Sequence, residues 1–192
     1  MKSATVGEWQ CRLARASGEE QKREIQICIA AATASGNGSV EERLLRLMVW
    51  VGTYLTSHAA HSRERDPWKI LFSRDAWCDQ QVIVFLMLAG VLHECPGRAL
   101  SIYHCDGSNG HTVCEVHYDG GWHLYDVHSE HQSVYRDDTG RILSYEELCR
   151  DRHAIELEDH WWRGANGVGK EGFYMNARLP MICPVDWTRR SI

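Results

Sequence analysis

The hydrophobic pattern of this chain changes from helical to strand-like near residue 98, and this change restricts the fold more than any other feature of the sequence. Apolar residues recur at helical spacing after Ser39, and the pattern continues to about His58. Residues 98–105, 111–118 and 121–127 are instead rich in β-branched and aromatic residues, bounded by Gly, Asp and Asn. Helices followed by three antiparallel strands indicate an α+β fold.

Local signals predict where the helices begin and end. Ser39 is followed three residues later by Glu42, which is the pattern of a capping box. This pair predicts the N-terminus of the helix that runs to about His58. The next helix is expected to begin after a cap at Asp75 or a neighbour and to stop at Gly90 or soon after. Two further helices are expected over residues 22–34 and 144–150.

Length and composition indicate an ordinary globular domain. The chain has 192 residues, enough to bury a sizeable core. Hydrophobic residues at 44% and charged residues at 24% exclude a disordered or coiled-coil chain. We expect a single domain with a helical N-terminal part over residues 1–66, a catalytic core over 67–150 and an irregular C-terminal segment over 151–192.

Charge and apolar patterning exclude some partners. The formal net charge is -5, which argues against a nucleic acid partner because phosphate binding needs a basic surface. The most apolar run, residues 82–92, is shorter than the roughly 20 residues that span a bilayer, so no membrane partner is expected. The N-terminus lacks a secretory signal, which predicts a cytoplasmic protein whose eight cysteines are reduced thiols. The oligomeric state is left open.

Three residues stand out by their positions in these elements. Cys78 lies at the predicted start of a helix, His111 at the start of a strand, and Asp126 near the end of the next strand. A cysteine at a helix N-terminus faces the positive end of the helix dipole and unpaired backbone N–H groups, which stabilise a thiolate and can bind an oxyanion. An imidazole can then act as base and acid, and a carboxylate can orient it.

The turn between the two strands decides whether His111 and Asp126 can meet. If Asp119-Gly120 is a two-residue loop, Tyr118 pairs with Gly121 and His111 shares a face with Asp126 as a diagonal neighbour. Diagonal neighbours are roughly 7–8 Å apart at the backbone, which these side chains can bridge. A three-residue loop would put the two side chains on opposite faces.

Several sequence stretches carry a family resemblance. They are Trp-Cys-Asp-Gln at residues 77–80, an apolar helix, Pro-Gly-Arg at 96–98, the stretch 111–122 that begins with His111, and Asp126 fifteen residues after His111. This pattern resembles the transglutaminase-like superfamily, whose members have a papain-like α+β core with a Cys on a helix and His and Asp on adjacent strands. The resemblance covers about residues 76–127.

The resemblance implies a chemistry and a role for each residue. Cys78 would be the nucleophile, His111 the base and Asp126 the group that orients His111. The chain would catalyse acyl transfer or hydrolysis on an amide or thioester through an acyl-enzyme on Cys78, with no cofactor and with a small-molecule or peptidic acyl substrate. The chain departs from the family pattern at Ala76, where Gly is common, and at Val82, where a small residue is common.

Other residues near this constellation are candidates for substrate contacts. Trp77, beside the nucleophile, could form an apolar wall for the acyl group. The indole N–H of Trp68 is a candidate oxyanion donor, and His128, which follows Asp126 closely, could line the rim of the site. Three other cysteines are expected to belong to the core: Cys28, Cys105 and Cys114.

Two other classes of function remain open. A binding module could keep the same scaffold without catalysis. A zinc hydrolase could use a set of histidines, but their spacing forms no tight zinc signature, so no metal is expected. Residues 164–170 fit the start of a phosphate-binding loop, but the next residue is Glu171 instead of Ser or Thr, so nucleotide binding is rejected. The histidines considered for the zinc site are His58, His61, His123, His128 and His131.

Overall fold

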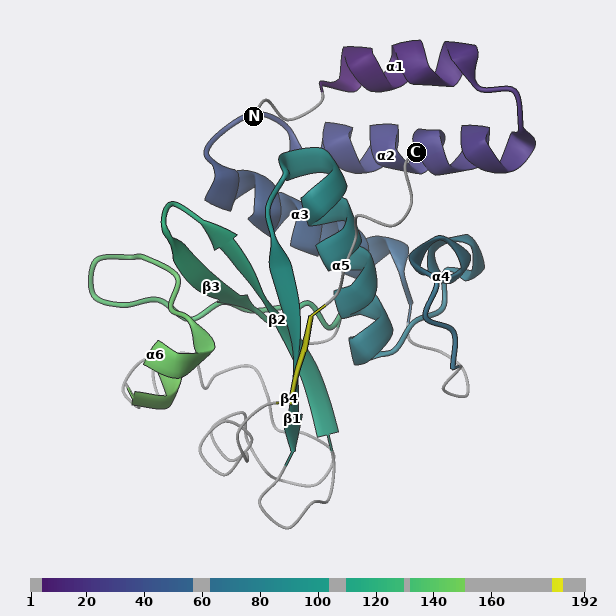
Figure 1. The fold of residues 1–192 in the computed structure, drawn as a ribbon. Helices are drawn as coiled ribbons and strands as arrows, with labels where there is room; N and C mark the ends of the chain where they lie inside the picture. The colour runs from purple at the N-terminus through teal and green to yellow at the C-terminus, as the bar shows by residue number, and fades with distance from the viewer. Residues whose placement is uncertain (1–4, 57–62, 104–109, 130–131, 151–180, 185–192) are drawn as a thin grey trace.

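The fold is α+β, with helices packed against one face of an antiparallel sheet (Figure 1). The computed structural model describes residues 5–56, 63–103, 110–129, 132–150 and 181–184. The helices are α1 (Val6–Arg15), α2 (Glu19–Ser35), α3 (Val40–Tyr54), α4 (Pro67–Ser73), α5 (Cys78–His93) and α6 (Tyr145–Arg150). The strands are β1 (Gly97–Tyr103), β2 (Gly110–Tyr118), β3 (Gly121–Tyr125) and β4 (Met181–Pro184).

The predicted capping box at the start of α3 is confirmed. The backbone N–H of Glu42 donates to Ser39 Oγ at 3.2 Å, and the backbone N–H of Ser39 donates to the Glu42 carboxylate at 2.9 Å. The helix ends at Tyr54, earlier than the expected end at His58. It ends there because Leu55 is extended and Thr56 forms a β-bridge with Asp75, which takes the chain out of the helix.

Two helices were not predicted from the sequence. Helix α1 begins at a capping box formed by Thr5 and Glu8. Helix α4 begins at Pro67, and the Asp66 side chain accepts a hydrogen bond from the backbone N–H of Trp68. Pro at the first helical position after an Asp cap is a known start signal, but seven residues are too few to show a helical period.

Helix α5 is the centre of the molecule. Ten of its 16 residues are buried, and they lie on all sides of the helix. It contacts α2, α3 and α4 together with β1 and β2, so it is enclosed between the other helices and the sheet (Figure 1). A helix that is apolar all round has no solvent face, which explains why the helix runs through Gly90 to His93.

The sheet has four antiparallel strands in the order β3-β2-β1-β4. Strand β4 falls in the C-terminal segment that was expected to be irregular, and its pairing with β1 was not predicted. Gly97 begins β1 where the strand approaches α5. A Cβ atom at this position would lie 2.4 Å from Leu86 Cδ2, so the close approach of strand and helix requires glycine.

The predicted two-residue turn between β2 and β3 is confirmed. Asp119 and Gly120 have φ values of 48° and 81°, and Tyr118 pairs with Gly121. Positive φ at both central residues is typical of the type I′ hairpin turn, which Asp-Gly favours. This turn sets the register of the whole hairpin.

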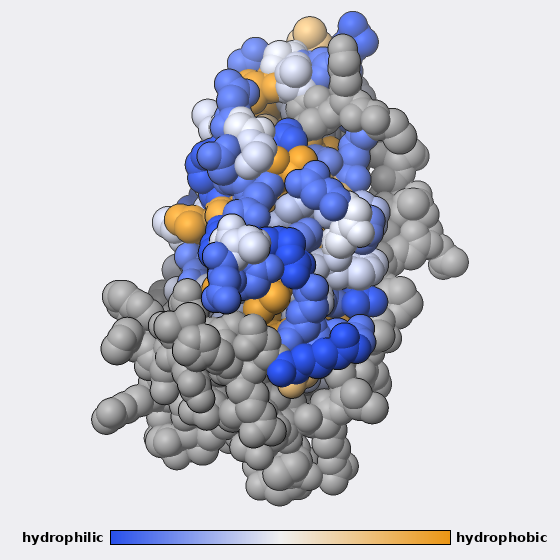
Figure 2. All heavy atoms as spheres, turned by 90° about the vertical axis from the view of Figure 1, so that its left-hand side faces the viewer, coloured by the Kyte–Doolittle hydropathy of each residue, from blue (hydrophilic) through white to orange (hydrophobic). Residues whose placement is uncertain are grey.

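The described surface is mostly polar. Figure 2 shows one face of the molecule, on which hydrophilic residues predominate and apolar residues form small separate groups. Val49 and Trp77 are the large hydrophobic side chains that are exposed within the described ranges. Along the same residues no helix is long and apolar enough to cross a bilayer.

A buried ion pair joins β1, β2 and α6. The Glu115 side chain is 0% exposed and accepts hydrogen bonds from the Arg98 guanidinium at 2.6 and 2.7 Å and from the backbone N–H of Tyr145 at 2.7 Å. The guanidinium also lies over the ring of Trp122, 4.2 Å from its centroid. These contacts satisfy a carboxylate that would otherwise be costly to bury.

We expect Arg98→Met to lower the free energy of unfolding by about 2–3 kcal/mol, because it leaves the Glu115 carboxylate buried without its cation. The double variant Arg98→Met/Glu115→Gln should recover part of this loss, since no buried charge remains. Urea denaturation of the three proteins measures both effects. A single variant as stable as the wild type would contradict this account.

Candidate active site

Cys78 is the first residue of α5 and is partly exposed. It therefore lies where the helix dipole and the N–H groups of the first turn, which lack acceptors within the helix, favour negative charge. Its neighbours fix the start of the helix. The Gln80 side chain accepts the Trp77 N–H at 3.1 Å and donates to the Glu64 carbonyl at 3.1 Å. Arg65 forms an ion pair with Asp79 at 2.8 Å.

The segment before α4 thus holds the N-terminus of α5 in place. Both contacts come from residues 64 and 65, more than ten residues before Cys78, and no local sequence pattern indicates them.

His111 and Asp126 meet as the hairpin register predicts. Cys114 pairs with Tyr125, so the same register places Val113 opposite Asp126 and His111 diagonal to it. His111 Nε2 lies 3.0 Å from both oxygens of the Asp126 carboxylate. The side chains are well buried, with exposures of 14% for His111 and 2% for Asp126.

The environment of His111 favours its charged form. Burial alone would lower the pKa of His111, but the Asp126 charge, its hydrogen bond and the interaction with Cys78 outweigh burial and raise the pKa to about 10. Cys78 is itself a hydrogen-bond partner of the ring. Because Nε2 is directed at the carboxylate, Nδ1 is the nitrogen that can face the thiol. Thiol, imidazole and carboxylate therefore form one connected chain.

A loop after β3 holds Asp126 in place. The backbone of Asp126 exchanges two hydrogen bonds with Ser133, each 3.0 Å long. The Gln81 side chain ties this loop to α5, because its oxygen accepts the Ser129 N–H at 2.8 Å and its nitrogen donates to the Ala76 carbonyl at 3.0 Å. Gln81 is 0% exposed, and a glutamine beside the apolar run of α5 is the sequence signal that could have identified it.

Three of the other described cysteines are buried in the core. Burial raises the pKa of Cys28 to about 12 and that of Cys95 to about 11, so both thiols stay protonated. Burial also raises the pKa of Cys114, which lies in the core as expected. Cys105 lies outside the described residues.

The remaining candidate residues have different surroundings. The ring of His128 lies 6.1 Å from that of His111, so the two imidazoles are neighbours. Trp77 is 41% exposed next to Cys78, as a wall at the rim would be. Trp68 is 4% exposed within the hydrophobic core, and its role as an oxyanion donor stays a prediction.

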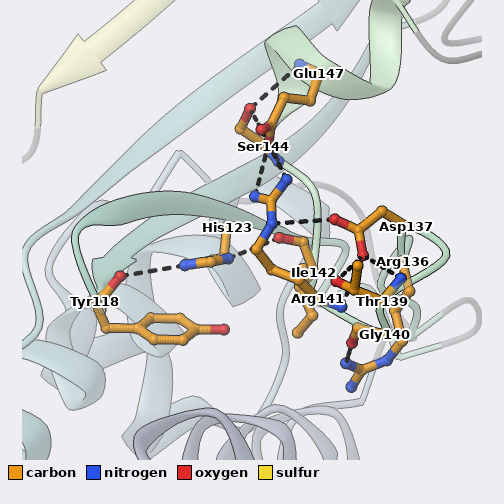
Figure 3. Close-up of polar contacts among 10 residues, drawn as sticks. All are labelled: Tyr118, His123, Arg136, Asp137, Thr139, Gly140, Arg141, Ile142, Ser144 and Glu147. Carbon is orange, nitrogen blue, oxygen red and sulfur yellow. Dashed lines mark hydrogen bonds and ion pairs between the residues drawn. The ribbon is translucent and has the colours of Figure 1, made fainter.

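His123 has a structural role that accounts for its conformation. Its Nδ1 lies 2.7 Å from the Ile142 carbonyl oxygen and its Nε2 lies 3.2 Å from the Tyr118 carbonyl oxygen (Figure 3). Both nitrogens are therefore engaged by the backbone. No group of three or more potential metal ligands occurs among the residues that the structure describes, and His58, His61 and His131 lie outside them.

Comparison with known proteins gives partial similarities of fold. No family model and no curated protein matches the chain. A "putative cysteine protease" from Cytophaga hutchinsonii is 16% identical over 53% of this chain and 36% of its own, with a TM-score of 0.46. A protein described as a TGase is 14% identical over 63% of this chain and 38% of its own, with a TM-score of 0.46.

Calcium-bound LapG from Legionella pneumophila is 12% identical over 75% of this chain and 78% of its own, with a TM-score of 0.45. The chain therefore spans little more than a third of the first two proteins. The α+β arrangement itself, with a helix that begins at Cys78 packed on the sheet, His111 on β2 and Asp126 directly after the adjacent β3, agrees with the one that the transglutaminase-like resemblance implies.

We expect NMR titration to show that Asp126 controls the charge of His111. In the wild type the ring should stay protonated through neutral pH, because its pKa is raised to about 10. In Asp126→Asn the pKa should fall far below that of the wild type, since the carboxylate no longer opposes burial and the interaction with Cys78 alone still raises the pKa. The Cε1–H chemical shift of His111 measures both values, and identical titrations would contradict the pairing.

The pairing of His111 with Asp126 also makes the free energy of unfolding depend on pH. Because the folded-state pKa lies above the unfolded value, the stabilisation is complete below about pH 6.5, provided that Asp126 is ionised, and is lost as the pH rises through about 10.

A substitution on α3 can test the position of the loop that follows β3. A Cβ at Gly52 would lie 1.9 Å from Gln132 Nε2, and this Gln132 amide donates to the Met48 carbonyl at 2.7 Å. Alanine in a helix is normally favoured over glycine by about 1 kcal/mol, yet we expect Gly52→Ala to destabilise the protein by about 1–3 kcal/mol. Adding Gln132→Ala should recover most of the loss. A stabilised single variant in urea denaturation would refute the contact.

Proposed function

We propose that the protein is a cysteine-dependent enzyme that forms an acyl-enzyme on Cys78 and passes the acyl group to water or an amine. The observation that carries the proposal is the continuous chain from Cys78 through His111 to Asp126. A partly exposed cysteine at a helix N-terminus, an imidazole in contact with it and a buried carboxylate behind the imidazole are the three parts that nucleophilic catalysis requires.

The resting state supplies the nucleophile. The raised pKa of His111 keeps the imidazolium charged at neutral pH, and this charge beside Cys78 stabilises the thiolate. Asp126 holds Nε2 and so directs Nδ1 toward the sulfur. The carboxylate thus acts through the imidazole, by orienting it and by stabilising its positive charge.

Each step then follows from these positions. The Cys78 sulfur attacks the carbonyl carbon of an amide or thioester, and the carbonyl electrons move to oxygen, where the backbone N–H groups at the start of α5 can receive the charge. As the bond to the leaving group breaks, the His111 imidazolium gives that group its proton. Neutral His111 then takes a proton from water or an amine, which attacks the thioester and releases the sulfur as thiolate.

The surroundings favour a specific small or peptidic acyl donor. Trp77 is exposed beside Cys78, and the ring of His128 lies 6.1 Å from that of His111. Together they would contact the acyl group and its leaving group near the sulfur. The proposed substrate is therefore an amide or thioester of limited size, with general cross-linking of large proteins less favoured.

Selective alkylation tests the nucleophile. Cys11 is an exposed cysteine on α1 and serves as an internal control in the same protein. At neutral pH we expect iodoacetamide to modify Cys78 at least tenfold faster than Cys11, and we expect Asp126→Asn to lose most of this preference because the imidazolium is no longer stabilised. Peptide mapping by mass spectrometry measures both rates.

Intact-mass analysis tests the covalent step. N-acetylcysteamine thioesters and short peptide amides are suitable acyl donors, and the wild type should gain the mass of the acyl group. Cys78→Ala should gain none, while Cys11→Ala should behave as the wild type. Equal reactivity of Cys78 and Cys11 together with no adduct from any donor would overturn the proposal and favour a non-catalytic binding module.

A further inference from the structure

A cavity lies at the opposite end of α5 from Cys78. It has a volume of about 530 Å³ and is bounded by the N-terminus of α1, the C-terminal end of α2, Arg43 on α3 and the last residues of α5, Leu92 and His93. Helix α5 has 16 residues and is therefore roughly 22 Å long, so the cavity is remote from the proposed catalytic centre. Its volume falls within the usual range for small-molecule sites.

The polar groups of this cavity have unmet hydrogen-bonding capacity. Arg43 Nε and both ring nitrogens of His93 are buried and have no hydrogen-bond partner among the described residues. Arg43 and His93 line the cavity, although the three nitrogens themselves are shielded and face it only if the side chains turn. Buried polar groups in folded proteins are normally paired, so three unpaired nitrogens in two lining residues call for an explanation. A ligand that accepts hydrogen bonds would provide it.

A neighbouring arginine on α3 is paired, in contrast to Arg43. Arg46, almost one turn further along α3, donates to the Ser35 carbonyl at 2.6 Å and to the Asn37 carbonyl at 2.5 Å. These are the carbonyls at the C-terminal end of α2, and Arg46 satisfies them. Arg43 makes no comparable contact among the described residues, although its charge acts on His93.

The charge of the cavity wall favours an anion. The residues that line it include the Arg43 cation and no carboxylate. The N-terminus of α1 beside it is already capped by Thr5 and Glu8, so Arg43 is the source of positive charge. Burial, followed by the Arg43 charge, lowers the pKa of His93 to about 4, so at neutral pH the ring is an uncharged donor and acceptor.

The remainder of the wall is apolar. Val6, Ala32 and Leu92 line the cavity together with the polar groups. A ligand that matches both parts has an anionic head and a short hydrocarbon chain.

We propose that this cavity binds a small organic anion, a short-chain carboxylate or phosphate monoester, with its head group at Arg43 and His93 and its chain along Val6, Ala32 and Leu92. The inference does not depend on the chemistry of Cys78. It requires only that Arg43 supplies the charge and that the apolar wall receives the chain.

Binding of hexanoate and hexyl phosphate to the full chain tests the proposal, with hexanamide as the uncharged analogue and chloride at equal ionic strength as the salt control. We expect one or both anions to raise the unfolding temperature in a saturable way, and isothermal titration calorimetry should give tighter binding than for butanoate or butyl phosphate. Hexanamide should not bind. The two anions together show which head group is preferred.

Four variants test whether the anion binds in this cavity. Arg43→Gln should weaken binding of the anion at least tenfold, since a charge-assisted hydrogen bond is lost, and His93→Leu should weaken it as well. Arg15→Gln removes the same charge from an exposed position of α1 and should bind as the wild type does. Cys78→Ala should also bind normally, which separates this site from the proposed activity.

Arg43→Gln has a second, diagnostic readout. Without anion this variant should be as stable as the wild type or more stable, because it removes a partly buried charge that has no partner. A purely structural arginine would instead destabilise the protein when replaced and leave the anion response unchanged. That result, or binding of neither anion, or equal binding of hexanamide, would overturn the proposal.

Discussion

The pairing of the buried Asp126 carboxylate with His111 is the interaction on which the candidate site depends. A carboxylate that is 2% exposed needs compensation, and the imidazolium provides it at 3.0 Å. The pairing exists because the Asp119-Gly120 turn adopts positive φ at both residues and so sets the register of β2 and β3. With one more residue in this turn, the two side chains would point to opposite faces of the sheet.

Helix α5 connects this pairing to the rest of the molecule. Because it is enclosed by other helices and by the sheet, its ends are fixed relative to the strands, and Cys78 at its first position meets the imidazole of β2. The polar residues next to Cys78 serve as anchors. Gln80 binds the segment before α4, and Gln81 binds the loop that supports Asp126, so two parts of the chain converge on the start of one helix.

The three buried or partly buried charges illustrate different solutions to one problem. Glu115 is satisfied by Arg98 and by a backbone N–H of α6. Asp126 is satisfied by a histidine that can also exchange protons, which is the property that catalysis would use. Arg43 has no partner among the described residues, and for this reason the cavity beside it is the part of the fold that an anionic ligand would complete.

The sequence by itself determined the features that local chemistry controls. The capping box of Ser39 and Glu42, the Asp-Gly turn and the alternation along β2 depend on neighbouring residues, so the α+β class, the hairpin register and the meeting of His111 with Asp126 could be predicted. Only the tertiary structure decided the rest. The anchors Glu64 and Gln81, the pairing of β4 with β1 and the cavity at His93 join residues that are far apart in the chain. Such contacts depend on how α5 packs against its neighbours, and no local period or turn signal encodes that packing.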